Sequence, residues 1–262
     1  MKYSQYLKLG INFVALSSCI ASIVFLQNKS LEQLEIVQDQ ETYLKEQEQF
    51  SAVAKIQKQL PSFGFNNLLA DWTFLQFVGY FGDGVARQVT GYSTVTDYFE
   101  DIVNRDPNFI QSHLVMSAAN SLFAGRPDKT VELINQALET VDPKSPNYPF
   151  LLWTYKAADE ILFLGDIEAA RHSNEMAARW ARLRQDDLGN EMAGRYDKTA
   201  NFLASDPDPT QAQFGAWMSI LYGTHDPKTQ DYILGKLKKL GAEINISPDG
   251  RLDIKPPKFN QA

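Results

Sequence analysis

Apolar residues recur at intervals of three and four along most of the chain, the spacing of one face of an α-helix. Asp-Pro pairs punctuate this pattern: Asp106-Pro107 and Asp142-Pro143 suit helix ends, while Asp208-Pro209 and Asp226-Pro227 suit helix starts. After residue 242, two short alternating runs flank a Pro-Asp-Gly turn, which predicts a β-hairpin followed by a frayed tail. The pattern therefore predicts an all-α protein with a small C-terminal β-hairpin in residues 242–262.

The densest apolar stretch runs from Ser62 to Asp83. Between Leu68 and Phe81 only four residues break the apolar run, namely Asp71, Thr73, Gln76 and Gly79. A helix that is apolar nearly all round is usually buried nearly all round. We therefore expect a central helix here, on which the other helices stack.

The segment from Leu9 to Leu26 is an uncharged run of 18 residues. As a helix it would span about 27 Å, close to the thickness of the hydrocarbon core of a bilayer. Lys2 and Lys8 precede it, so the positive-inside rule leaves residues 1–8 in the cytoplasm. We expect residues 9–26 to be a transmembrane signal anchor of a bacterial inner or thylakoid membrane, with the body in the periplasm or lumen.

Other interpretations of the same segment stay open. Leu16-Ser17-Ser18-Cys19 resembles a bacterial lipoprotein box, which would make Cys19 a lipidated N-terminus. The apolar run that continues to Leu26 argues against a lipoprotein, because a polar tether usually follows the modified cysteine. A cleaved signal peptide and a buried helix are the remaining alternatives.

Residues 27–60 are rich in Gln and Glu and contain neither Gly nor Pro. Helix-forming residues dominate this segment and its apolar stripe is thin, which predicts an exposed stalk helix that packs only its last turns on the body. A sustained heptad is absent, so coiled-coil dimerisation is not favoured and the oligomeric state stays open.

Residues 61–241 contain an internal repeat. Leu122-Phe123-Ala124-Gly125 recurs as Leu162-Phe163-Leu164-Gly165, and each glycine would end one helix and open a tight turn to the next. Small residues recur at matching distances before and after these glycines: Ala118 and Ala158 before, Ala137 and Ala177 after. This spacing predicts stacked helical hairpins whose paired helices approach closely at the small residues.

This pattern resembles the tetratricopeptide (TPR) repeat, with residues 165–177 as the best local match, although the Trp and Leu-Gly pair of the motif are missing and the spacings exceed 34 residues. The resemblance implies a TPR-like α-solenoid whose first helices line a groove that binds a protein partner. Carried over position by position, the candidate groove residues are Val115, Leu122, Phe123, Leu152, Tyr155, Asp159, Leu162 and Phe163. The same positions also suit a helix core. The Lys and Asn that clamp a peptide carboxylate in chaperone-binding members are absent.

Charge and candidate chemistry narrow the function. The net charge is −7, and the only charged residues among the first 30 are lysines, so the body is more acidic still and a nucleic-acid partner is excluded. His113, His172 and His225 lie far apart without a second ligand at metal-binding spacing. We expect no metal, no cofactor and no catalytic residues.

The Gln-rich segment followed by Ala70-Asp71-Trp72 and Tyr80-Phe81-Gly82-Asp83 also looks like membrane-anchored bacterial repeat proteins, cyanobacterial ones included, of unassigned role. These resemblances imply a scaffold or assembly factor that binds another protein on the trans side of the membrane. One alternative is a permanent structural subunit of a membrane complex. An envelope hydrolase is the less favoured one, because it would need carboxylates that converge in a cleft.

Overall fold

The computed structural model describes residues 18, 20–24, 40–224, 227–246 and 252–259, and the chain divides into two units, residues 1–43 and 44–262. In the first unit Ser18 and residues 20–24 are helical, and residues 40–43 begin helix α2 (Gln40–Gln57). The described chain is mostly helical, and β1 (Glu243–Ile246) pairs antiparallel with β2 (Leu252–Lys255). The predicted helical class and the C-terminal hairpin are confirmed.

The predicted anchor at residues 9–26, with its lipoprotein alternative at Cys19, lies mostly outside the described residues and stays a prediction. Within the part of the chain that the structure describes, no helix combines the length and the apolar character needed to cross a membrane.

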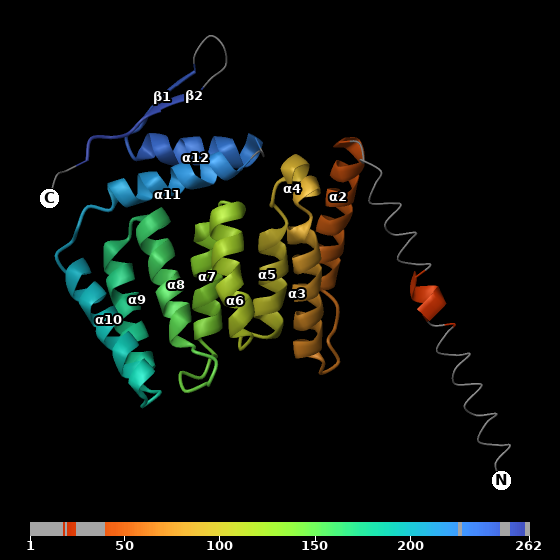
Figure 1. Ribbon diagram of the computed structural model, residues 1–262, viewed down its shortest axis with the longest axis horizontal. Helices are drawn as coiled ribbons and strands as arrows, with labels where there is room; N and C mark the ends of the chain where they lie inside the picture. The colour runs from red at the N-terminus through yellow and green to blue at the C-terminus, as the bar shows by residue number, and fades with distance from the viewer. Residues whose placement is uncertain (1–17, 19, 25–39, 225–226, 247–251, 260–262) are drawn as a thin grey trace. The chain divides into compact units, whose positions relative to one another are not determined.

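In the second unit the helices follow one another in chain order, and α11 and α12 lie across the ends of the others (Figure 1). Their bounds are α3 (Asn66–Gly82), α4 (Gly84–Thr90), α5 (Val95–Arg105), α6 (Ile110–Met116), η1 (Ser117–Phe123), α7 (Pro127–Leu138), α8 (Phe150–Asp159), η2 (Glu160–Leu164), α9 (Ile167–Arg182), α10 (Asp187–Leu203), α11 (Thr210–Gly223) and α12 (Pro227–Lys239). The π-helices η1 and η2 continue α6 and α8 without a break.

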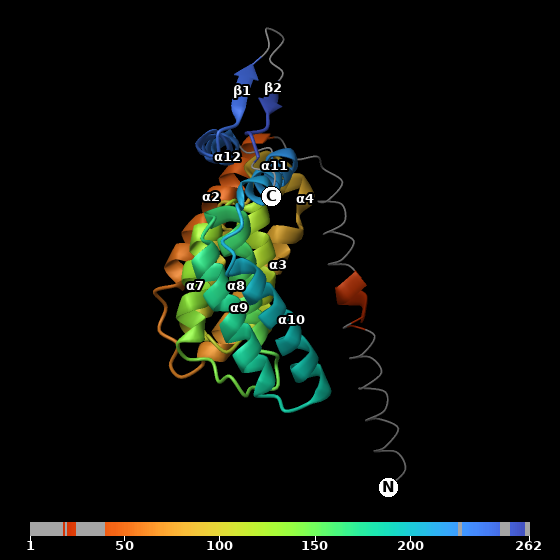
Figure 2. The same ribbon diagram turned by 90° about the vertical axis from the view of Figure 1, so that its left-hand side faces the viewer.

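Three pairs of helices form successive hairpins: α3 packs on α5, η1 on α7, and α8 on α9. Figure 2 shows the two sides of this stack, with α3 and α10 on one side and α7 on the other. The main core lies between them and includes Phe77 of α3, whose ring centroid is 4.6 Å from that of Phe99 in α5. Short side chains on α9, among them Ala170, Ala177 and Ala181, are fully buried and let α8 and α10 approach.

Each repeated Leu-Phe-x-Gly ends in the same kind of corner. Gly125 has φ +65° and Gly165 has φ +68°, the left-handed conformation that glycine adopts without strain. A Cβ atom at Gly165 would lie 2.8 Å from Gln213 Nε2 of α11, and one at Gly125 would lie 3.2 Å from Thr229 Cγ2 of α12. The two corners therefore favour glycine for their backbone conformation, and a Cβ atom there would also displace the side-chain ends of Gln213 and Thr229.

The expected burial of α3 is wrong. Ala70, Thr73, Phe77 and Tyr80 are buried, but the opposite face, which carries Leu68, Trp72, Leu75 and Val78, is exposed. Helix α3 packs on α5 along one face only, and no helix of the described chain covers the other. The apolar residues all round α3 reflect one core face and one exposed apolar face.

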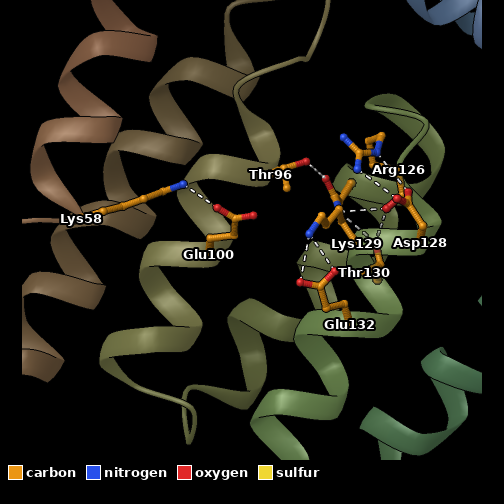
Figure 3. A network of polar contacts seen from close by, with 9 residues as sticks. Lys58, Thr96, Glu100, Arg126, Asp128, Lys129, Thr130 and Glu132 are labelled. Carbon is orange, nitrogen blue, oxygen red and sulfur yellow. Dashed lines mark hydrogen bonds and ion pairs between the residues drawn. The ribbon is translucent and has the colours of Figure 1, made fainter.

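Helix α2 is mostly exposed and packs on the body in its last turns, as expected, but it also contacts the body earlier, at Gln47. Gln47 Nε2 donates to Thr94 Oγ1 at 2.6 Å, and Gln57 Nε2 donates to Thr73 Oγ1 at 2.7 Å. Lys58 Nζ pairs with Asp97, and it also pairs with Glu100, as Figure 3 shows. Most of α2 from residue 44 on is exposed, with Ala54 and Gln57 as its buried residues, so a few inward contacts hold an otherwise solvated helix on α3 and α5. Residues 27–39 lie outside the described chain.

The small repeat positions split into two groups. Ala137 and Ala177 are fully buried, as expected of close helix contacts. Ala118 and Ala158, by contrast, are exposed, so their predicted close packing is wrong. The π-helical turns of η1 and η2 contain more residues than α-helical turns, and counting back from Gly125 or Gly165 at α-helical spacing therefore selects the wrong face.

This difference gives a matched pair of stability predictions. Ala177→Leu should lower the free energy of unfolding by about 1–3 kcal/mol, because Leu overpacks a fully buried contact. Ala158→Leu should change it by about 0.5 kcal/mol at most, since that residue is exposed. Leu and Ala have similar helix propensities, so denaturant melts of both variants compare packing alone. An equal loss in both would show that Ala158 faces a packed contact.

Candidate binding surface

The helices α6–η1 and α8–η2 each expose one face. Its residues step at intervals of three and four: Gln111, Val115, Ala118 and Leu122 on α6–η1, and Tyr155 and Ala158 with the half-buried Leu151 and Leu162 on α8–η2. Leu75 and Val78 are exposed on α3, opposite α5. These ten residues are called the apolar face below, and Gln111 is the most polar of them.

The histidine and the charged side chains of α6–η1 and α8–η2 are buried. His113, Lys156, Asp159 and Glu160 are each no more than 7% exposed. A surface helix normally turns its charged residues to water and its apolar residues inward. Here the exposed face is uncharged and the charged groups are buried, which is the arrangement that marks an interaction surface.

The predicted groove residues fall into two groups in the structure, one exposed and one buried. Val115, Leu122, Phe123 and Tyr155 are between 37% and 45% exposed, and Leu162 is half-buried. Phe123 packs at the edge of this set, with its ring centroid 5.0 Å from that of Phe81. The exposed set lies on α6–η1 and α8–η2, which contact each other.

Leu152, Asp159 and Phe163 do not line a groove, because all three are buried. Leu152 belongs to the main core, and the ring of Phe163 lies 5.1 Å from that of Trp217, under α11. The π-helical turn shifts the second half of α8–η2 relative to a regular helix, so the carried-over positions fall on two faces.

Asp159 is a buried acid held by hydroxyl groups. Ser121 Oγ donates to Asp159 Oδ2 at 2.9 Å and Ser117 Oγ donates to the same oxygen at 3.3 Å. Burial raises the pKa of Asp159 to about 7, against the two serine hydrogen bonds, which lower it, and with a smaller upward contribution from the charge of Glu160. The side chain is 3% exposed, so it stabilises the hairpin interface and does not meet a bound molecule.

Beside it, Lys156 and Glu160 form a buried ion pair with Ser173 of α9. Lys156 Nζ lies 2.8 Å from Glu160 Oε1 and donates to Ser173 Oγ at 3.1 Å, while Ser173 Oγ donates to Glu160 Oε2 at 2.7 Å. The three groups satisfy one another within the protein, as a buried charge pair requires.

A further polar network joins α5, η1 and α7 (Figure 3). Thr96 Oγ1 donates to Asn120 Oδ1 at 2.5 Å, and Asn120 Nδ2 donates to Thr130 Oγ1 at 3.1 Å. Arg126 pairs with Asp128 at the start of α7. The network fixes η1 relative to its neighbours and so positions the apolar face, but it leaves no group free for chemistry.

A cleft of about 540 Å³ lies between α2 and α3, and no pattern in the sequence predicts it. It is lined by Glu46, Gln49, Phe50, Val53, Gln76, Gly79, Tyr80, Asp83 and Tyr98. Among the described residues, the buried Oε1 atom of Gln76 has no hydrogen-bond partner. Residues 27–60 were expected to be a stalk, and a stalk would not form the wall of a cleft.

Neither metal-binding groups among the described residues nor similarity to known proteins indicates a further function. The described residues hold no group of three or more His, Cys, Asp or Glu side chains that could bind a metal ion. Comparison with known proteins adds no family: no family model, no curated protein and no solved structure matches this chain.

Proposed function

We propose that the protein is a membrane-anchored helical-repeat scaffold or assembly factor that binds another protein through its apolar face. The observation that carries the proposal is the inverted pattern of α6–η1 and α8–η2, with Val115, Leu122 and Tyr155 exposed while His113, Lys156, Asp159 and Glu160 are buried. Covering apolar surface contributes about 25 cal/mol per Å², so a partner that fits this face gains free energy from it.

The order of the helices supports a TPR-like assignment. Helix pairs α3–α5, η1–α7 and α8–α9 stack as hairpins, and the exposed apolar residues lie on the first helix of each pair. In tetratricopeptide arrays, the first helices line the groove that holds an extended or helical peptide. The face has no charged residue, so the expected ligand is an apolar segment and not an acidic or C-terminal peptide.

The location follows from the sequence. The uncharged segment at residues 9–26, with Lys2 and Lys8 before it, favours an anchor whose N-terminus is cytoplasmic. The body and its apolar face would then act in the periplasm or lumen, where the partner would be a protein of the same membrane or compartment.

The test is site-specific photocrosslinking in native membranes. A photoreactive amino acid at Tyr155 should give a discrete crosslinked product with a second protein, because this side chain is 37% exposed on the apolar face. The matched control is Asn135, which is exposed on α7 in the other layer and should give none. Leu122→Lys should abolish the product by placing a charge in the contact. Equal products from Tyr155 and Asn135, or none from Tyr155, would contradict the proposal.

A further inference from the structure

The connection between α2 and α3 carries further exposed apolar residues, at the end of the exposed side of α3 that leads through Trp72 to Leu75 of the apolar face. Leu60, Phe63, Phe65 and Leu68, together called the tip below, are 51%, 85%, 64% and 64% exposed. The tip lies at the end of the second unit away from α11 and α12 (Figure 1). Four large apolar side chains at one corner are more than the scattered exposed residues of an ordinary surface.

The backbone of the tip holds Phe63 outward. Phe63 has φ +48° and Gly64 has φ +91°, so two successive residues adopt the left-handed conformation. This conformation is unfavourable for a residue with a Cβ atom, and Phe63 does not recover the loss by packing, since its ring is almost fully exposed. A Cβ atom added at Gly64 would meet nothing within 4 Å, so the turn projects into open space.

Three backbone N–H groups of this turn and of the start of α3 are paired within the segment. Phe65 N–H donates to the Ser62 carbonyl at 2.8 Å, and Leu69 N–H donates to the Phe65 carbonyl at 3.1 Å. Leu60 N–H donates to the Gln57 carbonyl at 3.0 Å. An apolar medium penalises unpaired backbone groups heavily, and these internal bonds lower the penalty for entering one.

Charge is absent from the tip. Residues 59–70 contain no Asp, Glu, Lys or Arg, although such residues make up 22% of the chain. Lys58, the charged residue before this run, is held by Asp97 at 2.7 Å and by Glu100 at 2.6 Å. The tip therefore offers a partner neither charge complementarity nor an oriented salt bridge, only apolar and aromatic side chains on a protruding turn.

We propose that the tip inserts into the interfacial region of a lipid bilayer, with Phe63 deepest. A fluid medium can surround a protruding apolar turn, and Phe, Trp and Leu are the side chains that favour this region. Trp72, which is exposed on α3 beyond the tip, would lie nearer the headgroups. The absence of basic residues from the tip makes anionic lipids unnecessary. The inference rests on the proposed function only for the presence of a membrane, and not on the apolar face.

The experiment places a fluorescent reporter at the tip of the full chain. Phe63→Trp is measured in vesicles of phosphatidylcholine, with and without bromine on the acyl chains, against the parent protein as background. The added emission should shift to the blue and should be quenched by the brominated lipid. Phe202→Trp is the matched control, because Phe202 is 62% exposed on α10 and should show neither effect. Adding Phe65→Ser to Phe63→Trp should reduce the quenching.

Three results would overturn the proposal. One is emission from Phe63→Trp that is the same in plain and brominated vesicles. Another is equal quenching for Phe63→Trp and Phe202→Trp. The third is a blue shift that appears only when membrane proteins are added to the vesicles, which would make the tip a protein-binding surface. Crosslinking from Tyr155 tests the apolar face independently, so failure of one proposal is distinguishable from failure of the other.

Discussion

Replacing Lys156 by Met is expected to lower the free energy of unfolding by about 3–5 kcal/mol at pH 8. Lys156 is 7% exposed and Glu160 is 3% exposed, and their charged atoms lie 2.8 Å apart. Removing the ammonium group leaves a buried carboxylate whose remaining hydrogen bond comes from Ser173 Oγ. Denaturant unfolding of the detergent-solubilised full chain, followed by circular dichroism, gives the value.

The control is the double variant Lys156→Met with Glu160→Leu. It removes both charges and should recover most of the lost free energy, since well-packed apolar residues commonly replace a buried ion pair with little loss. The ion pair of Arg195 and Glu191 provides a surface comparison, because both side chains are more than half exposed and Arg195→Met should cost about 1 kcal/mol or less. A loss of that small size for Lys156→Met would mean that water reaches Glu160.

The second large effect concerns Asp159, whose pKa is raised to about 7 by burial. A raised acid pKa means that the folded protein binds a proton more tightly than the unfolded chain. The resulting stability is fully present below the unfolded pKa near 3.8 and is lost as the pH rises through 7. Asp159→Asn removes this loss and should raise the free energy of unfolding at pH 8.5 by up to about 4 kcal/mol, at 1.36 kcal/mol per pKa unit.

The pH profile separates Asp159 from His113. Burial lowers the pKa of His113 to about 4, against a hydrogen bond to the Pro107 carbonyl, so its contribution has the opposite sign. That stability is present above pH 6.5 and is lost as the pH falls to about 4. The two contributions therefore nearly cancel between about pH 4 and 6.5 in the parent protein.

The Asp159→Asn variant should show the pH dependence of the unfolding free energy that His113 contributes. Melts of the variant at half-unit intervals should show stability rising from pH 4 to 6.5 and constant above. His113→Gln with native Asp159 should show the reverse, a fall in stability from pH 4 to 7. Identical profiles for the parent and Asp159→Asn would mean that Asp159 is already charged in the folded protein at low pH.

The features that the sequence predicts correctly are those that depend on residues close together in the chain. The glycine corners at Gly125 and Gly165, the helix starts around Pro209 and Pro227 and the C-terminal hairpin depend on residues within a few positions of one another. Backbone preferences of Gly and Pro act over that distance, so the pattern alone locates these features.

What the sequence did not predict depends on contacts between distant segments. Gln47 and Gln57 have the composition of a stalk, and only the positions of Thr94 and Thr73 turn them into inward hydrogen bonds. The π-helical turns are also absent from the pattern, and equivalent positions differ in their packing: Phe123 is 39% exposed, whereas Phe163 is buried against Trp217. An apolar residue on a helix can belong to the core or to an interface, and periodicity does not separate the two.

The corners at Gly125 and Gly165 also bear on how the chain folds while it is being synthesised. Each hairpin contacts the next one along the chain, so the stack from α3 to α10 can assemble as it emerges, N-terminal part first. Thr229 and Gln213, which pack on the two corners, and Trp217, which covers Phe163, are made last. We expect nascent chains that end at residue 204 to protect the backbone amides of α9 from hydrogen exchange while the corners stay open to chaperones. Closure by α11 and α12 would then mark the completed protein.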